Sequence, residues 1–166
     1  VRSMILDVEA GERYFGSHPP EVARDLITRV RSEIPADCHL GLCFFARGDE
    51  PAKIHIDEWL PHVQSLHPMV YHWDFSNGTS GPQPYLDEAF ERLAPYELPI
   101  VPILGTYPDP DSGKPVPEAH MVEAAHYALA KGAAGISYFV LSTAVDGCAG
   151  PPQFSAIRQV QINAES

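Results

Sequence analysis

The chain has 166 residues, of which 45% are hydrophobic, so it is long enough to form one domain around an apolar core. No apolar run approaches the ~20 residues of a membrane-spanning helix. The 22 acidic and 11 basic side chains give a formal net charge of −11. That charge repels phosphate backbones and anionic membrane surfaces, so we expect neither nucleic acid nor a membrane as a partner.

The start of the sequence and the cysteines bear on the compartment in which the protein acts. The sequence opens Val-Arg-Ser, with no basic, apolar and small-residue regions of a signal peptide. We expect a piece of a longer protein, incomplete at its N-terminus. Three cysteines (Cys38, Cys43 and Cys148) form an odd set without CxxC spacing, which disfavours zinc-ribbon and thioredoxin sites and leaves one disulfide open.

Apolar segments alternate with amphipathic ones along the whole chain, and we predict a single domain over residues 1–166. The predicted strands are 1–8, 40–46, 69–75, 100–104 and 136–141, and the predicted helices are 21–34, 56–66, 85–94, 118–131 and 154–162. The strands are continuous apolar runs, which are typical of a parallel sheet covered by helices. Two architectures fit: part of a (β/α)8 barrel, or a five-stranded doubly wound sheet.

The residues that follow the strands favour the barrel. Barrel enzymes carry their chemistry at the carboxyl ends of the strands, and here these ends hold carboxylates and aromatic rings. A nucleotide-binding sheet would need a glycine-rich loop after its first strand. The loop here reads Ala10-Gly11-Glu12-Arg13, with the wrong spacing and an acidic residue where phosphate would lie.

Asp7 and Glu9 are the candidate catalytic residues. Side chains two residues apart on a strand point to the same side, so both carboxylates would face one cavity. Two like charges that close raise the pKa of one group, and a carboxylic acid that stays protonated can donate its proton to a glycosidic oxygen. We expect Glu9 to be this acid and Asp7 to tune it. The alternative is an ordinary solvated strand end.

Aromatic residues at the other strand ends are candidates for sugar contacts. In the predicted third strand, Tyr71, Trp73 and Phe75 would share one face. Aromatic rings suit the apolar faces of pyranose rings, so we expect Trp73, with Asp74, to bind substrate and Tyr71 to reach the reaction centre. The alternative is that these rings only pack. Tyr107 and Tyr138 are the corresponding candidates on the last two strands.

Three motifs resemble barrel glycoside hydrolases that cleave amino-sugar polymers. Ile5-Leu6-Asp7-Val8-Glu9 resembles the Asp-x-Glu strand of family 25 lysozymes and family 18 chitinases. Met69-Val70-Tyr71 resembles the Met-x-Tyr that follows two strands later in chitinases. Gly135-Ile136-Ser137-Tyr138-Phe139 resembles a last barrel strand.

The resemblance implies that the chain covers strands four to eight of a barrel. It implies Glu9 as proton donor, Asp7 as its partner and Tyr71 as an assisting tyrosine. A retaining glycosidase acting on peptidoglycan or another N-acetyl amino-sugar polymer would follow, with a polysaccharide or oligosaccharide as partner and no cofactor. An extracellular or cell-wall location is expected for the parent protein. The missing strands would expose an edge, so a homodimer or the missing N-terminal barrel segment would cover it.

Other readings stay open. A barrel-derived module can keep aromatic contacts and lose catalysis, which would leave a noncatalytic carbohydrate-binding or structural domain. The eight histidines lack the H-x-H or H-x-x-x-H spacing of metal-dependent barrels, so we expect no metal site. Ser137 lacks a Gly-x-Ser-x-Gly context, and Cys43 has no evident activating histidine.

Overall fold

The structure is a computed structural model that describes residues 2–11, 14–16, 18–140 and 151–163. Its five strands form one parallel sheet in the order β1-β2-β3-β4-β5. The strands are β1 (Ser3–Asp7), β2 (His39–Phe44), β3 (Ser65–Val70), β4 (Ile103–Gly105) and β5 (Ser137–Phe139). Each strand pairs with the next along the chain, as in a (β/α) barrel. A doubly wound sheet would reverse its strand order, so this alternative is wrong.

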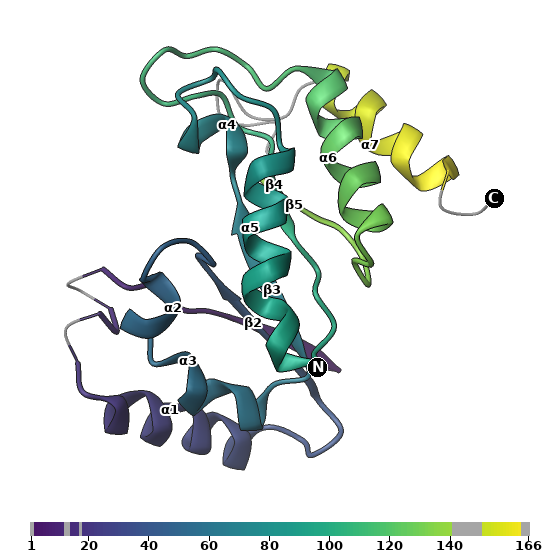
Figure 1. The fold of residues 1–166 in the computed structure, drawn as a ribbon. Helices are drawn as coiled ribbons and strands as arrows, with labels where there is room; N and C mark the ends of the chain where they lie inside the picture. The colour runs from purple at the N-terminus through teal and green to yellow at the C-terminus, as the bar shows by residue number, and fades with distance from the viewer. Residues whose placement is uncertain (1, 12–13, 17, 141–150, 164–166) are drawn as a thin grey trace.

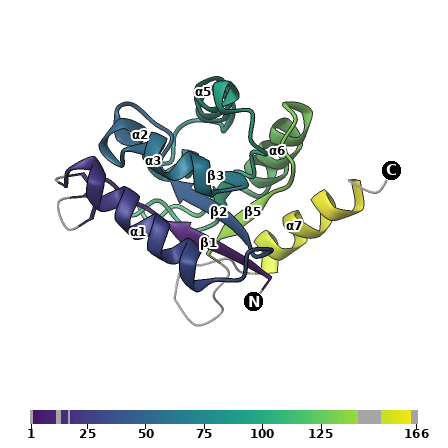
Figure 2. The same cartoon turned by 90° about the horizontal axis from the view of Figure 1, so that it is seen from below.

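The helices cover one face of the sheet, and Figures 1 and 2 show them fanned around the outside of the curved strands. The α-helices are α1 (Pro20–Glu33), α2 (Glu50–Lys53), α3 (Ile56–Trp59), α4 (His72–Phe75), α5 (Gln83–Leu93), α6 (Glu118–Ala130) and α7 (Pro151–Asn163). Two 3-10 turns, η1 (Leu60–His62) and η2 (Ala94–Tyr96), precede β3 and β4. The result is a curled half-barrel, as the sequence predicted.

Alternate residues of the strands build the main core against the helices. Leu40, Leu42 and Phe44 of β2 are fully buried, as are Leu66 and Leu104 on the next strands. They pack on apolar side chains of α1, α3, α5 and α6, which include Ala23, Ile27, Trp59, Leu86, Ala89 and Ala124. Burial of this kind is the dominant stabilising term in folding. This helix-facing side of the sheet therefore carries most of the stability.

The other alternate residues face the inside of the half-barrel, which we call the concave face. Its residues, from register and packing, are Ile5, Asp7, Gly41, Cys43, Ser65, His67, Met69, Ile103, Gly105 and Phe139. Small, polar and aromatic side chains dominate here. Two of the exposed large apolar side chains, Ile5 at 47% and Phe139 at 49% exposure, lie on this face. The concave face is therefore only partly packed.

The third strand differs from its prediction. It runs over Ser65–Val70, not over 69–75, because residues 72–75 form the turn of α4, in which the Phe75 N–H donates to the Tyr71 carbonyl. The predicted shared face of Tyr71, Trp73 and Phe75 is therefore wrong. Ser65 and His67 are polar, so they interrupt the apolar pattern that would indicate a strand in the sequence. Both are nevertheless buried on the concave face and bond to each other.

Some predicted features fall where the structure gives no description. Val1 and Leu141, the outer ends of two predicted strands, lie outside the described residues, and so does Cys148. Cys38 and Cys43 are both buried free thiols. In the described part of the chain, no helix has both the length and the apolar character needed to cross a membrane.

Candidate active site

Asp7 and Glu9 lie at the carboxyl end of β1. Asp7 is the last residue of the strand and pairs in register with Cys43 of β2, while Glu9 follows in the loop. The backbone fixes this loop, because the Val8 N–H donates to the Cys43 carbonyl and the Glu9 carbonyl accepts from the Phe15 N–H. Burial raises the pKa of Glu9, and the negative charges of Asp7 and Glu50 raise it further. Glu9 thus favours its protonated form more than a solvated glutamate does.

Tyr71 and Cys43 lie within electrostatic reach of this pair. Burial raises the pKa of the Cys43 thiol well above its usual value, and the charge of Asp7 and a hydrogen bond to it add to the shift. Burial also raises the pKa of the Tyr71 phenol, with smaller contributions from Cys43, Asp7 and Glu9. Both groups therefore stay protonated at neutral pH. Tyr71 can donate a hydrogen bond, and Cys43 is a poor nucleophile.

Tyr71 is the centre of an aromatic cluster at the carboxyl edge of the concave face. Its ring contacts four others at centroid distances of 5.5 to 6.0 Å: Phe45, Phe75, Tyr107 and Phe139. Gly105 makes this packing possible, because a Cβ there would come within 3.3 Å of the Tyr71 ring and 3.4 Å of the Tyr107 ring. Tyr71 is only 8% exposed, so most of its ring face is already used within the protein.

Asp74 and Tyr107 form a polar contact at the edge of this cluster. The Tyr107 hydroxyl donates to Asp74 Oδ2 at 2.9 Å, and the two groups come from α4 and from the loop after β4. Burial raises the pKa of Tyr107, and the hydrogen bond to Asp74 raises it further. Beside them, the Arg47 guanidinium lies 4.3 Å from the centre of the Phe75 ring. Arg47 also forms an ion pair with Glu88 at 3.7 Å.

Trp73 and Tyr138 do not join this cluster. Trp73 is 9% exposed, its indole N–H donates to the Lys114 carbonyl, and it packs with Val116 and Met121 near α6. Tyr138 pairs in register with Leu104 and packs on the helix-facing side, where burial raises its pKa to about 12. The packing alternative therefore describes these two rings, and a role for either in binding substrate disagrees with its position.

The sequence did not single out three rings of the cluster and one polar network as functional. Phe45, Phe75 and Phe139 carry no polar group, and they come from the end of β2, from α4 and from β5, so only the folded structure shows that they pack together around Tyr71. The network runs deeper on the concave face. Ser65 Oγ lies 2.9 Å from His39 Nε2 and 2.8 Å from His67 Nε2. The Ser-x-His spacing was the available signal for it.

Gly41 makes room for this network. A Cβ at residue 41 would lie 2.6 Å from His67 Nε2 and 3.0 Å from Ser65 Oγ. One hydroxyl can donate to one imidazole and accept from the other, so a single serine can bond to both rings. Burial lowers the pKa of His67, and nearby His39 lowers it further. The network lies at the amino-terminal end of the strands, where side chains in barrels usually serve stability.

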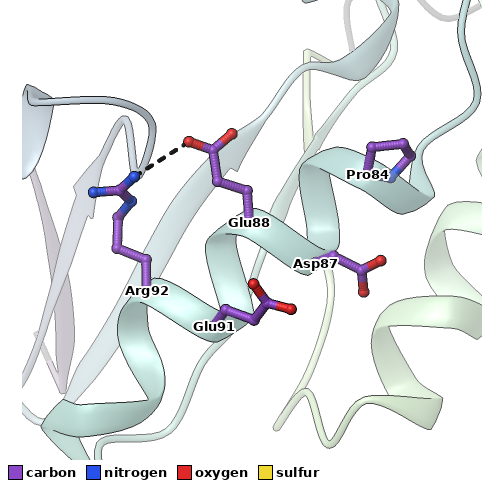
Figure 3. A pocket seen from close by; sticks show the side chains of 5 residues that line it. All are labelled: Pro84, Asp87, Glu88, Glu91 and Arg92. Carbon is purple, nitrogen blue, oxygen red and sulfur yellow. Dashed lines mark hydrogen bonds and ion pairs between the residues drawn. The ribbon is translucent and has the colours of Figure 1, made fainter.

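The described residues contain no group of three or more histidine, cysteine, aspartate or glutamate side chains placed to hold a metal ion. An open hollow of about 470 Å³ lies on the outer side of α5, lined by Pro84, Asp87, Glu88, Glu91 and Arg92 (Figure 3). Three of its four charged side chains form ion pairs: Arg92 pairs with Glu88, and Asp87 pairs with Lys131. This hollow has no aromatic lining and lies away from the concave face, so it is a poor candidate for a sugar site.

Comparison with known proteins supports the fold. No family model and no curated protein matches the chain. Among solved structures, bee venom hyaluronidase is similar with a TM-score of 0.50 and 10% sequence identity, over 99% of this chain and 69% of that one. The chain has a glycosidase-like fold. At this identity the likeness is one of fold alone, and it shows membership of neither family 25 nor family 18.

Proposed function

We propose that this domain is a glycosidase that acts on peptidoglycan or another N-acetyl amino-sugar polymer, with Glu9 as the proton donor. One observation carries the proposal: Glu9 has a raised pKa at the carboxyl end of β1, within electrostatic reach of Tyr71. Chemistry in barrel enzymes takes place at this end of the strands. The glycosidase-like fold, shared with a hyaluronidase, is consistent with the proposal.

Each residue has a defined task in this proposal. Protonated Glu9 gives its proton to the glycosidic oxygen as the bond to the anomeric carbon breaks. The acetamido oxygen of the sugar attacks that carbon from the opposite face, so the protein supplies no second nucleophile. Water then opens the cyclic intermediate and returns its proton to Glu9, with retention of configuration. Ionised Asp7 stabilises the positive charge that develops on the sugar, and the Tyr71 hydroxyl orients the acetamido group.

The proposed partner is a polysaccharide or an oligosaccharide, and no cofactor is needed for these steps. A parent protein that meets such polymers would work outside the cell or at the cell wall. Asp74 and Tyr107 hold each other in place through their hydrogen bond, and together they would bind the sugar.

A second candidate is a noncatalytic carbohydrate-binding or structural module. The observation that favours it is the packing of the cluster, because the Tyr71 ring is 8% exposed and contacts four other rings. A site filled by its own side chains leaves less room for a pyranose. In that case the carboxylates at the end of β1 would bind a sugar without cleaving it, or would simply be solvated.

The experiment is the release of reducing ends from peptidoglycan and chitooligosaccharides by the chain and by its longest natural parent. Glu9→Gln keeps the size of the side chain and removes the proton donor. We expect it to lower kcat by at least ~100-fold, the lower range for loss of a general acid. Glu50→Gln is the matched control, because Glu50 contributes charge to the Glu9 site but forms an ion pair with Lys53.

Binding of the same oligosaccharides is measured on the same proteins by calorimetry. Cleavage that depends on Glu9 and not on Glu50 supports the glycosidase. Binding without cleavage in every protein supports the noncatalytic module. If both the chain and its parent fail to bind and fail to cleave these sugars, that result would contradict the glycosidase and the carbohydrate-binding module and leave only the structural module.

A further inference from the structure

The loop after β1 carries an exposed aromatic ring beside Glu9. Tyr14 is 51% exposed, the highest fraction among the exposed large apolar and aromatic side chains of the described residues. The Phe15 N–H donates to the Glu9 carbonyl at 3.2 Å. Tyr14 directly precedes Phe15, so its Cα lies at most about 6 Å from that carbonyl oxygen. The ring therefore belongs to the same rim as the proposed proton donor.

The backbone that carries Tyr14 is fixed by close contacts within the described part of the loop. The Tyr14 N–H donates to the Gly11 carbonyl at 2.9 Å. Gly16 lets two stretches of backbone meet, because a Cβ at this position would lie only 1.9 Å from the Ala10 carbonyl oxygen. No residue with a side chain fits there unless the loop opens. The position of Tyr14 relative to the end of β1 is therefore set by the loop itself.

Phe15 and His18 anchor the loop to α3. The Phe15 ring meets the fully buried Trp59 ring edge to face, with the centroids 5.0 Å apart. His55 Nε2, at the start of α3, lies 2.6 Å from the His18 carbonyl oxygen. Because α3 connects β2 to β3, these contacts draw the loop toward the middle of the sheet and away from the unpaired edge of β1. Phe15 thus points into the core, and its neighbour Tyr14 points into solvent.

Gly11 supports one edge of the Tyr14 ring. A Cβ at residue 11 would lie 3.2 Å from Cδ2 and 3.7 Å from Cε2 of Tyr14, so this edge of the ring rests against the Gly11 backbone. Half of the side chain stays open to solvent. A tyrosine supported in this way presents a rigid, amphipathic surface and loses little conformational entropy on binding. Single exposed rings are common on proteins, and what distinguishes Tyr14 is its support and its place beside Glu9.

We propose that Tyr14 is a substrate-binding residue whose exposed ring stacks on the apolar face of a pyranose next to the glycosidic bond that Glu9 protonates. The inference rests on the proposed function and adds a sugar contact to it. The rings expected to bind sugar offer less surface, because Tyr71 is 8% exposed among four other rings and Trp73 packs near α6. Tyr14 supplies the free ring surface that these two lack.

The test measures cleavage of chitooligosaccharides by the longest natural parent and its variants. Stacking stabilises the bound substrate and the transition state alike, so Tyr14→Ala should raise KM by roughly 3- to 10-fold and leave kcat nearly unchanged. Tyr14→Phe keeps the ring and should behave like the unaltered protein. Tyr96→Ala is the matched control, because Tyr96 lies in η2 before β4, at the opposite end of the sheet. A thermal melt of each variant confirms that it is folded.

Binding measured without turnover separates this inference from the enzymatic proposal. In a Glu9→Gln background, calorimetry should show that Tyr14→Ala weakens the binding of chitooligosaccharides by the same factor and that Tyr14→Phe does not. Tyr14→Trp adds a direct reporter, because the two natural tryptophans, Trp59 and Trp73, are buried. The fluorescence of the indole introduced at residue 14 should shift to shorter wavelength when the sugar covers it.

The outcomes distinguish the two proposals. If the parent cleaves the sugars and Tyr14→Ala changes neither KM nor Kd, the role of Tyr14 is overturned and the glycosidase stands. If the parent binds without cleaving, the glycosidase fails, and a weaker Kd in Tyr14→Ala supports the sugar contact, whereas an unchanged Kd overturns it. An equal loss in Tyr14→Phe would also overturn it, because the hydroxyl and not the ring would make the contact. If the parent neither binds nor cleaves, both proposals fail.

Discussion

The two faces of the sheet differ in what their side chains do. On the helix-facing side, Leu40, Leu42, Leu66 and Leu104 are at most 2% exposed and belong to one apolar core. On the concave face, neighbouring positions of the same strands carry a thiol, imidazoles and aromatic rings, and Ile5 remains half exposed. The strands are shared, so the difference lies only in the alternation of side chains along each strand.

This difference separates stability from chemistry. Substitutions on the helix-facing side should change the free energy of unfolding and affect activity only through unfolding. Substitutions of the carboxylates Asp7 and Glu9, at the carboxyl edge of the concave face, should change the proposed chemistry and leave stability nearly constant. The predictions below test this separation.

The largest effect on stability is expected in the helix-facing core. Leu42 is completely buried, so Leu42→Ala should lower the free energy of unfolding by about 2–5 kcal/mol. Ile103→Ala removes a half-buried side chain from the concave face and should cost clearly less. Urea unfolding monitored by circular dichroism measures both. Equal losses would contradict the difference between the faces.

His72 is a polar exception among the residues that the helices bury. It is 1% exposed, and neither ring nitrogen has a hydrogen-bond partner among the described residues. Its ring lies 5.6 Å from that of His120 on α6. Burial lowers the pKa of His72 to about 4, and His120 adds to the shift. The unfolded chain therefore binds this proton more readily than the folded chain between about pH 6.5 and pH 4.

The sign of the pH effect follows. Stability is fully present above pH 6.5 and falls as the pH drops toward 4, by an upper bound of about 3 kcal/mol. His72→Leu should remove this part of the acid sensitivity, whereas His18→Leu, at an exposed site, should retain it. Melting temperatures measured from pH 7 to pH 4 distinguish the variants. An unchanged slope in His72→Leu would show that other groups dominate.

The network on the concave face predicts an intermediate effect. Gly41→Ala would place a Cβ 2.6 Å from His67 Nε2, so the imidazole must leave Ser65 or the strands must separate. We expect a loss of about 1–3 kcal/mol, as for other overpacked sites. Gly135→Ala is the control, because its nearest neighbour would be Val101 at an ordinary 3.8 Å. Similar stability of the two variants in urea would argue against the packing described for Gly41.

The smallest effect concerns the carboxylate pair. The charge of Asp7 is the second cause of the raised Glu9 pKa, after burial. Asp7→Asn should therefore lower the pKa of Glu9 without returning it to that of a solvated glutamate. Carbon-13 NMR titration of the glutamate carboxyl groups, with Glu9→Gln used to assign the signal, measures this shift directly. An unchanged Glu9 titration would mean that the two carboxylates are not close in solution.

The architecture could be predicted from the sequence because its signals are local. Continuous apolar segments alternate with amphipathic helices, and this pattern requires a parallel sheet with helices outside. β3 was placed four residues late because Ser65 and His67 are polar but buried. Their partners, His39 and each other, depend on strand register, which local pattern does not contain.

The site could be predicted only in part, for the same reason. Asp7, Glu9 and Tyr71 come together because each lies at or next to the carboxyl end of its strand. The α4 turn directs Trp73 away from Tyr71, and the start of β5 decides that Phe139 rather than Tyr138 faces the concave side. A shift of one residue exchanges the two faces of a strand, so the sequence of a short strand does not indicate which of its side chains face the concave side.

The central claim is that Glu9 supplies chemistry and not stability. The most direct test measures turnover of chitooligosaccharides and thermal stability on the same samples of the longest natural parent, with and without Glu9→Gln. Because burial and nearby charges disfavour ionised Glu9, we predict a slightly higher melting temperature at pH 7, no gain below about pH 4.5, and at least ~100-fold slower turnover. Turnover that is unchanged, or that falls only because the variant unfolds, would contradict the claim.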